Sequence, residues 1–135
     1  MANAFYPAFI AAQLGQSMSG SPTITGTLKV VLIDTADYTY SSAHDFYDDA
    51  SAGAVGTPTT LASQTYTGGL LDAADTTITA VTGDPCEALI LFLDTGTPST
   101  SRLVAYIDTG VTGLPVTPNG GNIVIGWNAS GILQF

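Results

Sequence analysis

The sequence contains very few cationic side chains. Of its 135 residues, 2 are Lys or Arg and 11 are Asp or Glu, which gives a formal net charge of −9. Nucleic-acid binding needs several cationic contacts to displace the counterions of the phosphates, and here only Lys29 and Arg102 could make them. An anionic membrane surface also attracts basic residues. The composition therefore argues against nucleic acids and membranes as partners.

Cysteine and long hydrophobic runs are equally scarce. Cys86 is the single cysteine, so the chain can form no intrachain disulfide and no cysteine-based zinc or iron–sulfur centre. The longest aliphatic and aromatic run, residues 88–93, is too short to span a bilayer. The N-terminus lacks the cationic head of a secretory signal. We expect synthesis in the cytoplasm without export, and we expect Cys86 to be a small buried hydrophobic residue.

Hydroxyl groups and glycine replace charge in this chain. Charged residues make up 10% of it, against about 25% in typical domains, whereas it holds 20 Thr, 10 Ser and 15 Gly. Such a composition favours short β-strands and turns over solvated helices. With a mean hydropathy of +0.33, few charges remain to cover the exterior. We expect part of the surface to be buried against other subunits.

A helical pattern occupies only the N-terminus. Apolar residues four apart predict a helix over residues 1–15, with Asn3 as its N-cap and Gly15 just past its end. The stretch 16–26 is small and polar and predicts a linker loop. The apolar stripe consists of Phe5, Phe9, Tyr6, Ile10 and Leu14.

From residue 27 onwards the pattern is typical of β-structure. Short apolar runs separated by turn residues predict a single domain with an antiparallel β-sandwich of jelly-roll type over 27–135, preceded by the helix. We expect a short helix over 42–49, a loop over 53–60, and hairpin turns at 118–121 and 128–131. The predicted strands are 27–33, 61–67, 75–81, 87–93, 102–107, 123–127 and 132–135.

Three apolar runs end in Asp-Thr followed by a small residue, at Asp34, Asp94 and Asp108. One hypothesis is that each Asp closes a turn by accepting backbone N–H groups two residues on. The other is that the three carboxylates converge on Ca²⁺, which takes six to eight oxygen ligands. Turn chemistry is favoured, because Asp is common in turns and no EF-hand spacing is present.

The sequence offers little for catalysis or for a cofactor. His44 is the only histidine, and in a helix it would share a face with Asp48, but two ligands do not make a metal site. A serine hydrolase would need His44 as its base, yet no nucleophile-elbow pattern is present. Acidic residues that could be paired for glycoside hydrolysis lie mostly in turn-like surroundings. We therefore predict neither an enzyme nor a cofactor or metal.

Aromatic residues could form a platform for sugar stacking. Trp127 and several tyrosines are candidates, although aromatic residues in strands belong more often to a core or an interface.

Four segments together resemble a known group of proteins. They are residues 1–7 (Met-Ala-Asn-Ala-Phe-Tyr-Pro), 31–41, 101–109 and 113–121. In identity and order they are similar to a group of small tailed-bacteriophage proteins that are described as virion structural proteins. The resemblance covers most of the chain and carries no catalytic residues.

The resemblance implies a capsid decoration (cement) protein on the virion exterior. Its partners would be the major capsid protein and copies of itself, a trimer being one such arrangement; multiple contacts would add avidity. The alternative is a tail or fibre component that binds host-surface glycans. The loops 35–39 and 110–121 and the N-terminal helix are the expected contacts. The candidate interface residues are Phe5, Tyr6, Phe9, Ile10, Tyr38, Tyr40, Leu114 and Pro115.

Overall fold

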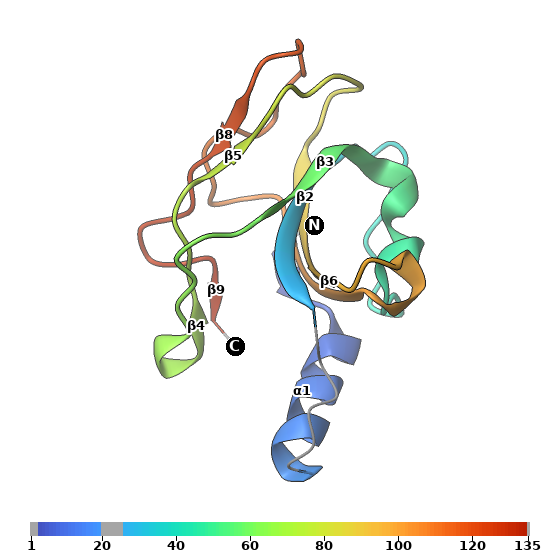
Figure 1. Ribbon diagram of the computed structural model, residues 1–135, viewed down its shortest axis with the longest axis vertical. Helices are drawn as coiled ribbons and strands as arrows, with labels where there is room; N and C mark the ends of the chain where they lie inside the picture. The colour runs from blue at the N-terminus through green and yellow to red at the C-terminus, as the bar shows by residue number, and fades with distance from the viewer. Residues whose placement is uncertain (1–2, 20–25, 135) are drawn as a thin grey trace.

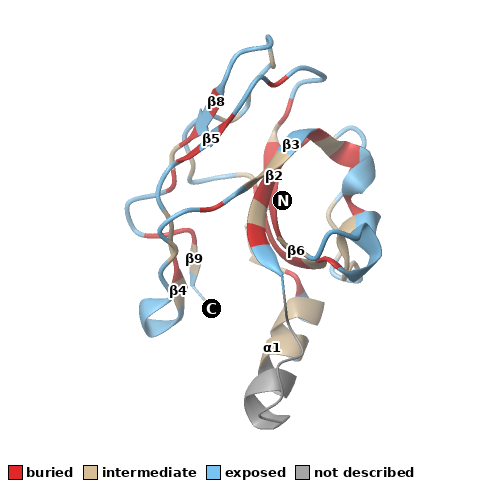
Figure 2. Ribbon diagram, viewed as in Figure 1, coloured by how far each residue is buried: buried red, intermediate tan, exposed pale blue. Residues whose placement is uncertain are grey.

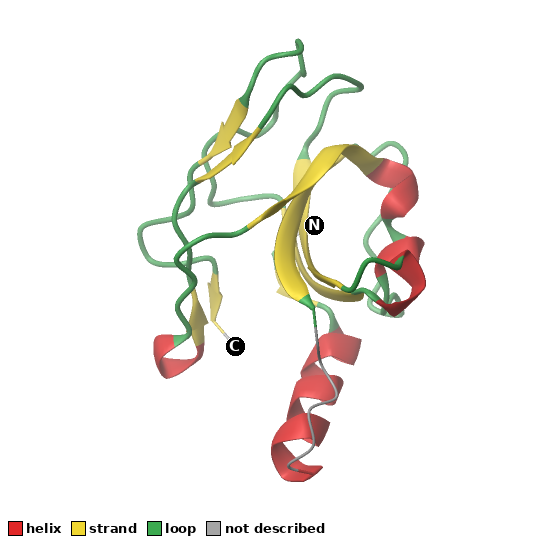
Figure 3. Cartoon of the chain, in the orientation of Figure 1, coloured by secondary structure: helices red, strands yellow, loops and turns green. Residues whose placement is uncertain are grey.

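The computed structural model describes residues 3–19 and 26–134 and is mainly β, with antiparallel strands and one α-helix (Figures 1 and 3). This confirms the predicted fold class. The central sheet has five strands in the order β1-β7-β6-β2-β3, and two ribbons pair β4 with β9 and β5 with β8. The strands of the central sheet are β1 (Ala4–Phe5), β2 (Thr27–Ile33), β3 (Ala54–Thr60), β6 (Ala88–Asp94) and β7 (Arg102–Ile107). Those of the ribbons are β4 (Leu70–Leu71), β5 (Thr76–Ile78), β8 (Ile123–Ile125) and β9 (Leu133–Gln134).

Strands β2, β6 and β7 form the centre of the molecule and are buried on both faces (Figure 2). Along β6, Leu89 and Leu91 point into one hydrophobic cluster, while Ile90 and Phe92 point into another. Because successive side chains of a strand alternate between faces, a sheet covered on both sides requires continuous apolar runs. This is why these strands read as unbroken hydrophobic segments.

The two faces of the sheet are covered differently (Figure 1). On one face, β5 and β8 contribute Ile78, Ile123 and Ile125 to the first cluster, which gives a sandwich-like packing. The other face is covered by the segment 34–53, with 3-10 turns at η1 (Tyr47–Asp49) and η2 (Ser51–Gly53). Two further 3-10 turns are η3 (Thr67–Gly69) and η4 (Pro98–Thr100).

The N-terminal helix α1 (Pro7–Ser19) begins later and ends later than predicted. Pro7 occupies its first position, where the missing N–H costs no hydrogen bond. Asn3 does not cap the helix, because its side chain bonds the backbone of Asp108 and Thr109. Gly15 lies inside α1 rather than past its end, so the predicted linker 16–26 starts within the helix. The rest of that linker, residues 20–25, lies outside the described residues.

Three expectations about local structure are wrong. The predicted short helix over 42–49 is only the η1 turn, and the predicted strand 61–67 is irregular chain that ends in η3. The predicted loop 53–60 is largely β3, an edge strand paired with β2. Pro58 argues against a strand in the sequence but is tolerated at an edge, where no partner needs its N–H.

The predicted hairpins are also wrong, although the turns themselves form. Asn119 accepts the N–H of Gly121 and Asn128 accepts that of Ser130, as turn chemistry requires. The strands beside these turns, however, do not pair with each other: β8 pairs with β5 and β9 with β4.

Candidate functional site

A groove lies between the start of α1 and the β4 end of the molecule. It encloses about 260 Å³. Among the described residues, those that line it carry no charge, so it offers apolar contact and a few amide groups. The residues that form its walls include Phe5, Phe9, Leu28, Leu71, Tyr66 and Val104.

The aromatic rings of this groove come from distant parts of the chain. Phe5 and Phe9 are stacked with centroids 6.1 Å apart, since β1 leads directly into α1. Tyr66 is 63% exposed, an unusual state for so large a side chain, and its hydroxyl donates to the side-chain oxygen of Gln64. The groove therefore leaves aromatic surface open to a partner.

A second concavity, on the opposite face of the sheet, is lined by tyrosines. It encloses about 280 Å³ between Thr35, Tyr38, Thr39, Tyr40 and Tyr106. We call it the tyrosine pocket. Tyr40 is half-buried, and its ring centroid lies 5.5 Å from that of Tyr106.

A buried hydrogen-bond chain fixes the wall of the tyrosine pocket. The hydroxyls of Tyr6 and Tyr38 are 2.8 Å apart, and that of Tyr38 lies 2.9 Å from Nδ1 of His44. Burial raises the pKa of Tyr6 far above its ordinary value, and the hydrogen bond with Tyr38 raises it further. Tyr6 therefore stays neutral and serves as an interior partner of Tyr38.

His44 is placed differently from the sequence expectation. Its Nδ1 contacts Tyr38, and because 42–49 is not an α-helix, the helical spacing that would bring it to Asp48 does not exist. Asp49 accepts the backbone N–H of Asp45, which lowers the pKa of its carboxyl. His44 is therefore a hydrogen-bond partner of Tyr38.

The two Asp turns predicted at Asp34 and Asp94 form as expected. Asp34 accepts the N–H of Ala36, and Asp94 accepts that of Gly96. At Asp108 the chain is held by Asn3, which accepts the N–H of Asp108 itself. The first two carboxylates lie at opposite ends of the β2–β6 pair, so the three predicted carboxylates do not converge.

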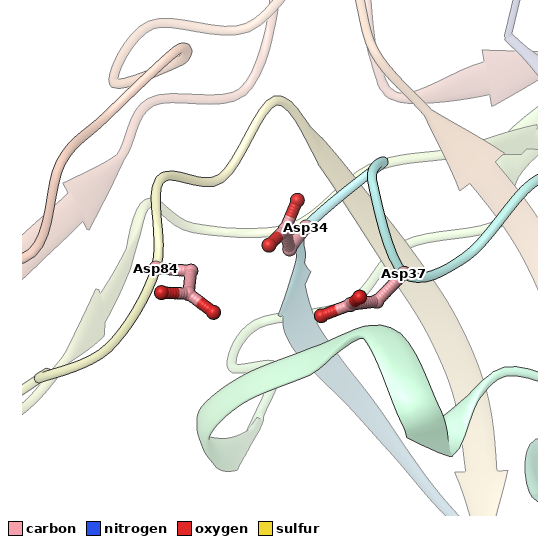
Figure 4. Close-up of side chains that lie close together, drawn as sticks. All are labelled: Asp34, Asp37 and Asp84. Atoms are coloured by element: carbon pink, nitrogen blue, oxygen red, sulfur yellow. The ribbon is translucent and has the colours of Figure 1, made fainter.

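A different set of carboxylates comes together. Oxygen atoms of Asp34, Asp37 and Asp84 lie within 4.8 Å of one another, and Figure 4 shows the three side chains around one space beside η2. Asp34 is buried, whereas the other two are exposed. Three oxygens supply at most half of a Ca²⁺ coordination shell. This cluster could not be predicted from the sequence, because Asp84 joins it from a loop fifty residues away from Asp34.

The other interface residues predicted from the sequence differ in how far they are buried. Ile10 is half-buried in α1; Leu114 is half-buried against the first cluster, and Pro115 is exposed. Tyr6 and Tyr38 are buried and support the surface from beneath. Trp127 is 8% exposed, and its indole N–H donates to Thr76. It is therefore a core residue and offers no platform for sugar stacking.

Sequence reasoning missed residues that complete both concavities. The sequence places Tyr66 in a predicted strand, and it offers Tyr66 and Tyr106 only as members of a sugar-stacking platform, not as parts of these two concavities. Alternation along β7 could have assigned Tyr106 to a face, but only the fold brings Tyr40 beside it.

The fold is mainly β, and its described residues include an apolar groove beside α1 and the tyrosine pocket. No protein-family model matches the chain, and no curated protein sequence matches it either. Within the described residues, no helix combines the length and hydrophobicity needed to cross a bilayer.

Proposed function

We propose that this protein is a structural subunit of a bacteriophage virion, a decoration protein that binds the major capsid protein on the capsid exterior. The resemblance of residues 1–7, 31–41, 101–109 and 113–121 to phage structural proteins supports this proposal. In this role the protein needs adhesive surface and no bond-making chemistry.

The observation that carries the proposal is helix α1. It extends away from the sheet (Figure 1) and contains no charged residue along its 13 positions. An isolated helix of this length is marginal in water even with good helix formers, and α1 has neither acidic residues in its first turn nor basic ones in its last. A partner that packs against α1 would supply the missing stabilisation.

The groove beside α1 extends the same surface. The centres of specific interfaces are depleted of charge and enriched in aromatic residues, which describes the surroundings of Phe5, Phe9 and Tyr66. Residues 1–28 contain no charged side chain at all. An acidic protein can approach a partner closely through such a face without burying unpaired carboxylates.

The alternative, a tail or fibre component that binds glycans, has less support. Its main candidate, Trp127, lies in the core. Binding to host envelopes in place of capsids would favour this alternative.

The test uses co-sedimentation with empty capsids. The wild-type protein should saturate the capsids at a fixed stoichiometry. Ala11→Glu places a charge on an exposed position of α1 and should weaken capsid binding by about tenfold or more, because a buried unpaired carboxylate costs several kcal/mol.

Ala52→Glu is the matched control, since Ala52 is exposed in η2 on the other side of the sheet. It should bind as the wild type does. If Ala11→Glu and Ala52→Glu bind equally well, α1 is not the anchor. If the wild-type protein does not bind capsids at all, the proposed function is wrong. Deleting residues 1–14 is less informative, because it removes the fully buried Tyr6.

A further inference from the structure

The tyrosine pocket has aromatic walls and lies near carboxylate groups. Glu87 lies at its edge, where one carboxylate oxygen accepts both the N–H and the hydroxyl of Thr35, at 3.0 and 2.7 Å. Burial raises the pKa of Tyr106, and the charges of Asp108 and Glu87 raise it further. The electrostatic potential around the Tyr106 ring is therefore negative, and a negative potential attracts cations.

The chain supplies no cationic side chain of its own to this pocket. Lys29 pairs with Asp94 at 2.7 Å, and the Arg102 guanidinium lies 4.7 Å from the ring centre of Phe46. In the sheet register these residues lie opposite Phe92 and Leu93, toward the end away from the pocket. They are the only Lys and Arg residues of the sequence, so any such group in the pocket must come from another molecule.

The walls are held in place before any ligand arrives. The Tyr38 ring is fixed by its hydroxyl contacts with Tyr6 and His44, and Tyr40 packs between Tyr6 and Tyr106 at 5.0 and 5.5 Å. A preorganised site loses little conformational entropy on binding. At about 280 Å³ the pocket falls below the size of most small-molecule sites, about 300–1,000 Å³, and suits one side chain.

We propose that the tyrosine pocket binds the cationic head of a Lys or Arg side chain presented by a partner protein. The half-buried Tyr40 offers its ring to the cation through the quadrupole, whereas Tyr38 and Tyr106, each 4% exposed, form the buried part of the wall. The carboxylate of Glu87 at the edge provides long-range attraction, and Thr35 and Thr39 border the site. The charge of −9 makes a basic partner segment the complementary one. This pocket lies on the face of the sheet opposite the groove beside α1, so the inference goes beyond the proposed function and does not depend on it.

The experiment is an NMR titration of the isolated protein with Nα-acetyl-lysine methylamide and Nα-acetyl-arginine methylamide. We expect saturable shifts of the Tyr40 and Tyr106 ring signals, and contacts from the ligand methylene protons to the ring of Tyr40. The neutral isostere Nα-acetyl-norleucine methylamide should bind at least about fivefold more weakly, in line with a cation–π and charge contribution of about 1 kcal/mol.

Variants separate the ring from its hydroxyl. Tyr40→Phe should retain binding within about threefold because the ring face remains, whereas Tyr40→Ala should weaken it about fivefold or more. Val124→Ala, at a 54% exposed position of β8, is the control and should have no effect. Thr39→Lys changes an exposed residue and should abolish binding by placing an ammonium group at the pocket, which gives a test even if Tyr40→Ala fails to fold.

Several results would overturn the inference. They are equal binding of the norleucine and lysine derivatives, shifts confined to acidic loops away from the tyrosines, unchanged binding by Thr39→Lys, and tighter binding of a neutral disaccharide than of either cation. None of these results bears on capsid binding through α1.

Discussion

At the residue scale, the neighbours Phe5 and Tyr6 show how the sequence connects the two faces of the sheet. Phe5 packs against the first hydrophobic cluster and Tyr6 belongs to the second. Their side chains point to opposite faces because the chain continues along β7 past the end of β1, where the N–H of Tyr6 donates to the carbonyl of Val104, and successive residues of such a chain alternate. The stretch predicted as one helical stripe is therefore split between two cores, and Tyr6 is fully buried.

The Tyr6 hydroxyl should contribute measurably to stability. Tyr6→Phe removes its hydrogen bond with Tyr38, which still has His44 as a partner. We expect the free energy of unfolding in urea to fall by about 1 kcal/mol, the net value of a typical hydrogen bond. Tyr66→Phe, at an exposed position, should change it by less than about 0.5 kcal/mol. An unaltered stability of Tyr6→Phe would contradict this account.

Cys86 should be chemically inert in the folded protein. It is fully buried, and burial, followed by the charges of Glu87, Asp34 and Asp84, raises the pKa of its thiol to about 11. Because the thiolate is the reactive form, a disulfide reagent at pH 8 should label Cys86 only after denaturant is added. Rapid labelling under native conditions would show that the strand end opens easily.

At the element scale, the sequence predicted the elements whose burial leaves a pattern. Residues 27–33 and 102–107 are β2 and β7 as expected, since strands covered on both faces need uninterrupted apolar runs. Strand β3 was missed because Gly56 and Pro58 argue against a strand, and its edge position cannot be recognised from the sequence. Tyr38 and Tyr40 were identified as candidates, but their meeting with Tyr106 depends on tertiary packing.

The end of the β2–β6 pair should respond to acid. The ion pair with Lys29, aided by the N–H of Gly96, lowers the pKa of Asp94 below its ordinary 3.8. A lowered folded-state pKa means that this stabilisation is present at neutral pH and is lost as the pH falls below 3.8 through the folded-state value.

Asp94→Asn should therefore reduce stability by about 0.5–1 kcal/mol at pH 7 and by less at pH 2. Thermal unfolding at both pH values measures the difference. Asp48→Asn, at an exposed site in η1, is the comparison for the loss of one negative charge at another exposed position. Equal losses at both pH values would contradict the role of the charge.

At the scale of the whole molecule, the negative charge opposes association of the protein with itself, whereas the apolar surface favours it. Only 10% of residues are charged, yet the net charge of −9 keeps separate molecules apart. All 11 acidic residues lie within residues 34–108, whereas α1 and the last 27 residues contain no charged side chain. The repulsion that keeps the protein dispersed is thus concentrated away from its proposed contact surface.

Removing this repulsion should cause association. Near the isoelectric point of about 4.1, protonation of part of the carboxylates brings the net charge of the protein to zero, and light scattering should rise steeply between pH 6 and about pH 4. Returning to pH 7 should reverse the change. Ala11→Glu should reduce the scattering, because it adds an acidic group to α1. Scattering that does not depend on pH would show that the uncharged surface of α1 does not cause association.

The pairing of β1 with β7 joins residues about a hundred positions apart, and it has a consequence during synthesis. While the ribosome is still translating, the first strand has no neighbour to join, so the sheet cannot close until residues 102–107 have emerged. Such long-range closure slows folding. Strand β1 therefore stays unpaired until β7 has been synthesised, and a chain that stopped before residue 102 would leave the uncharged helix α1 without the strand that anchors its start.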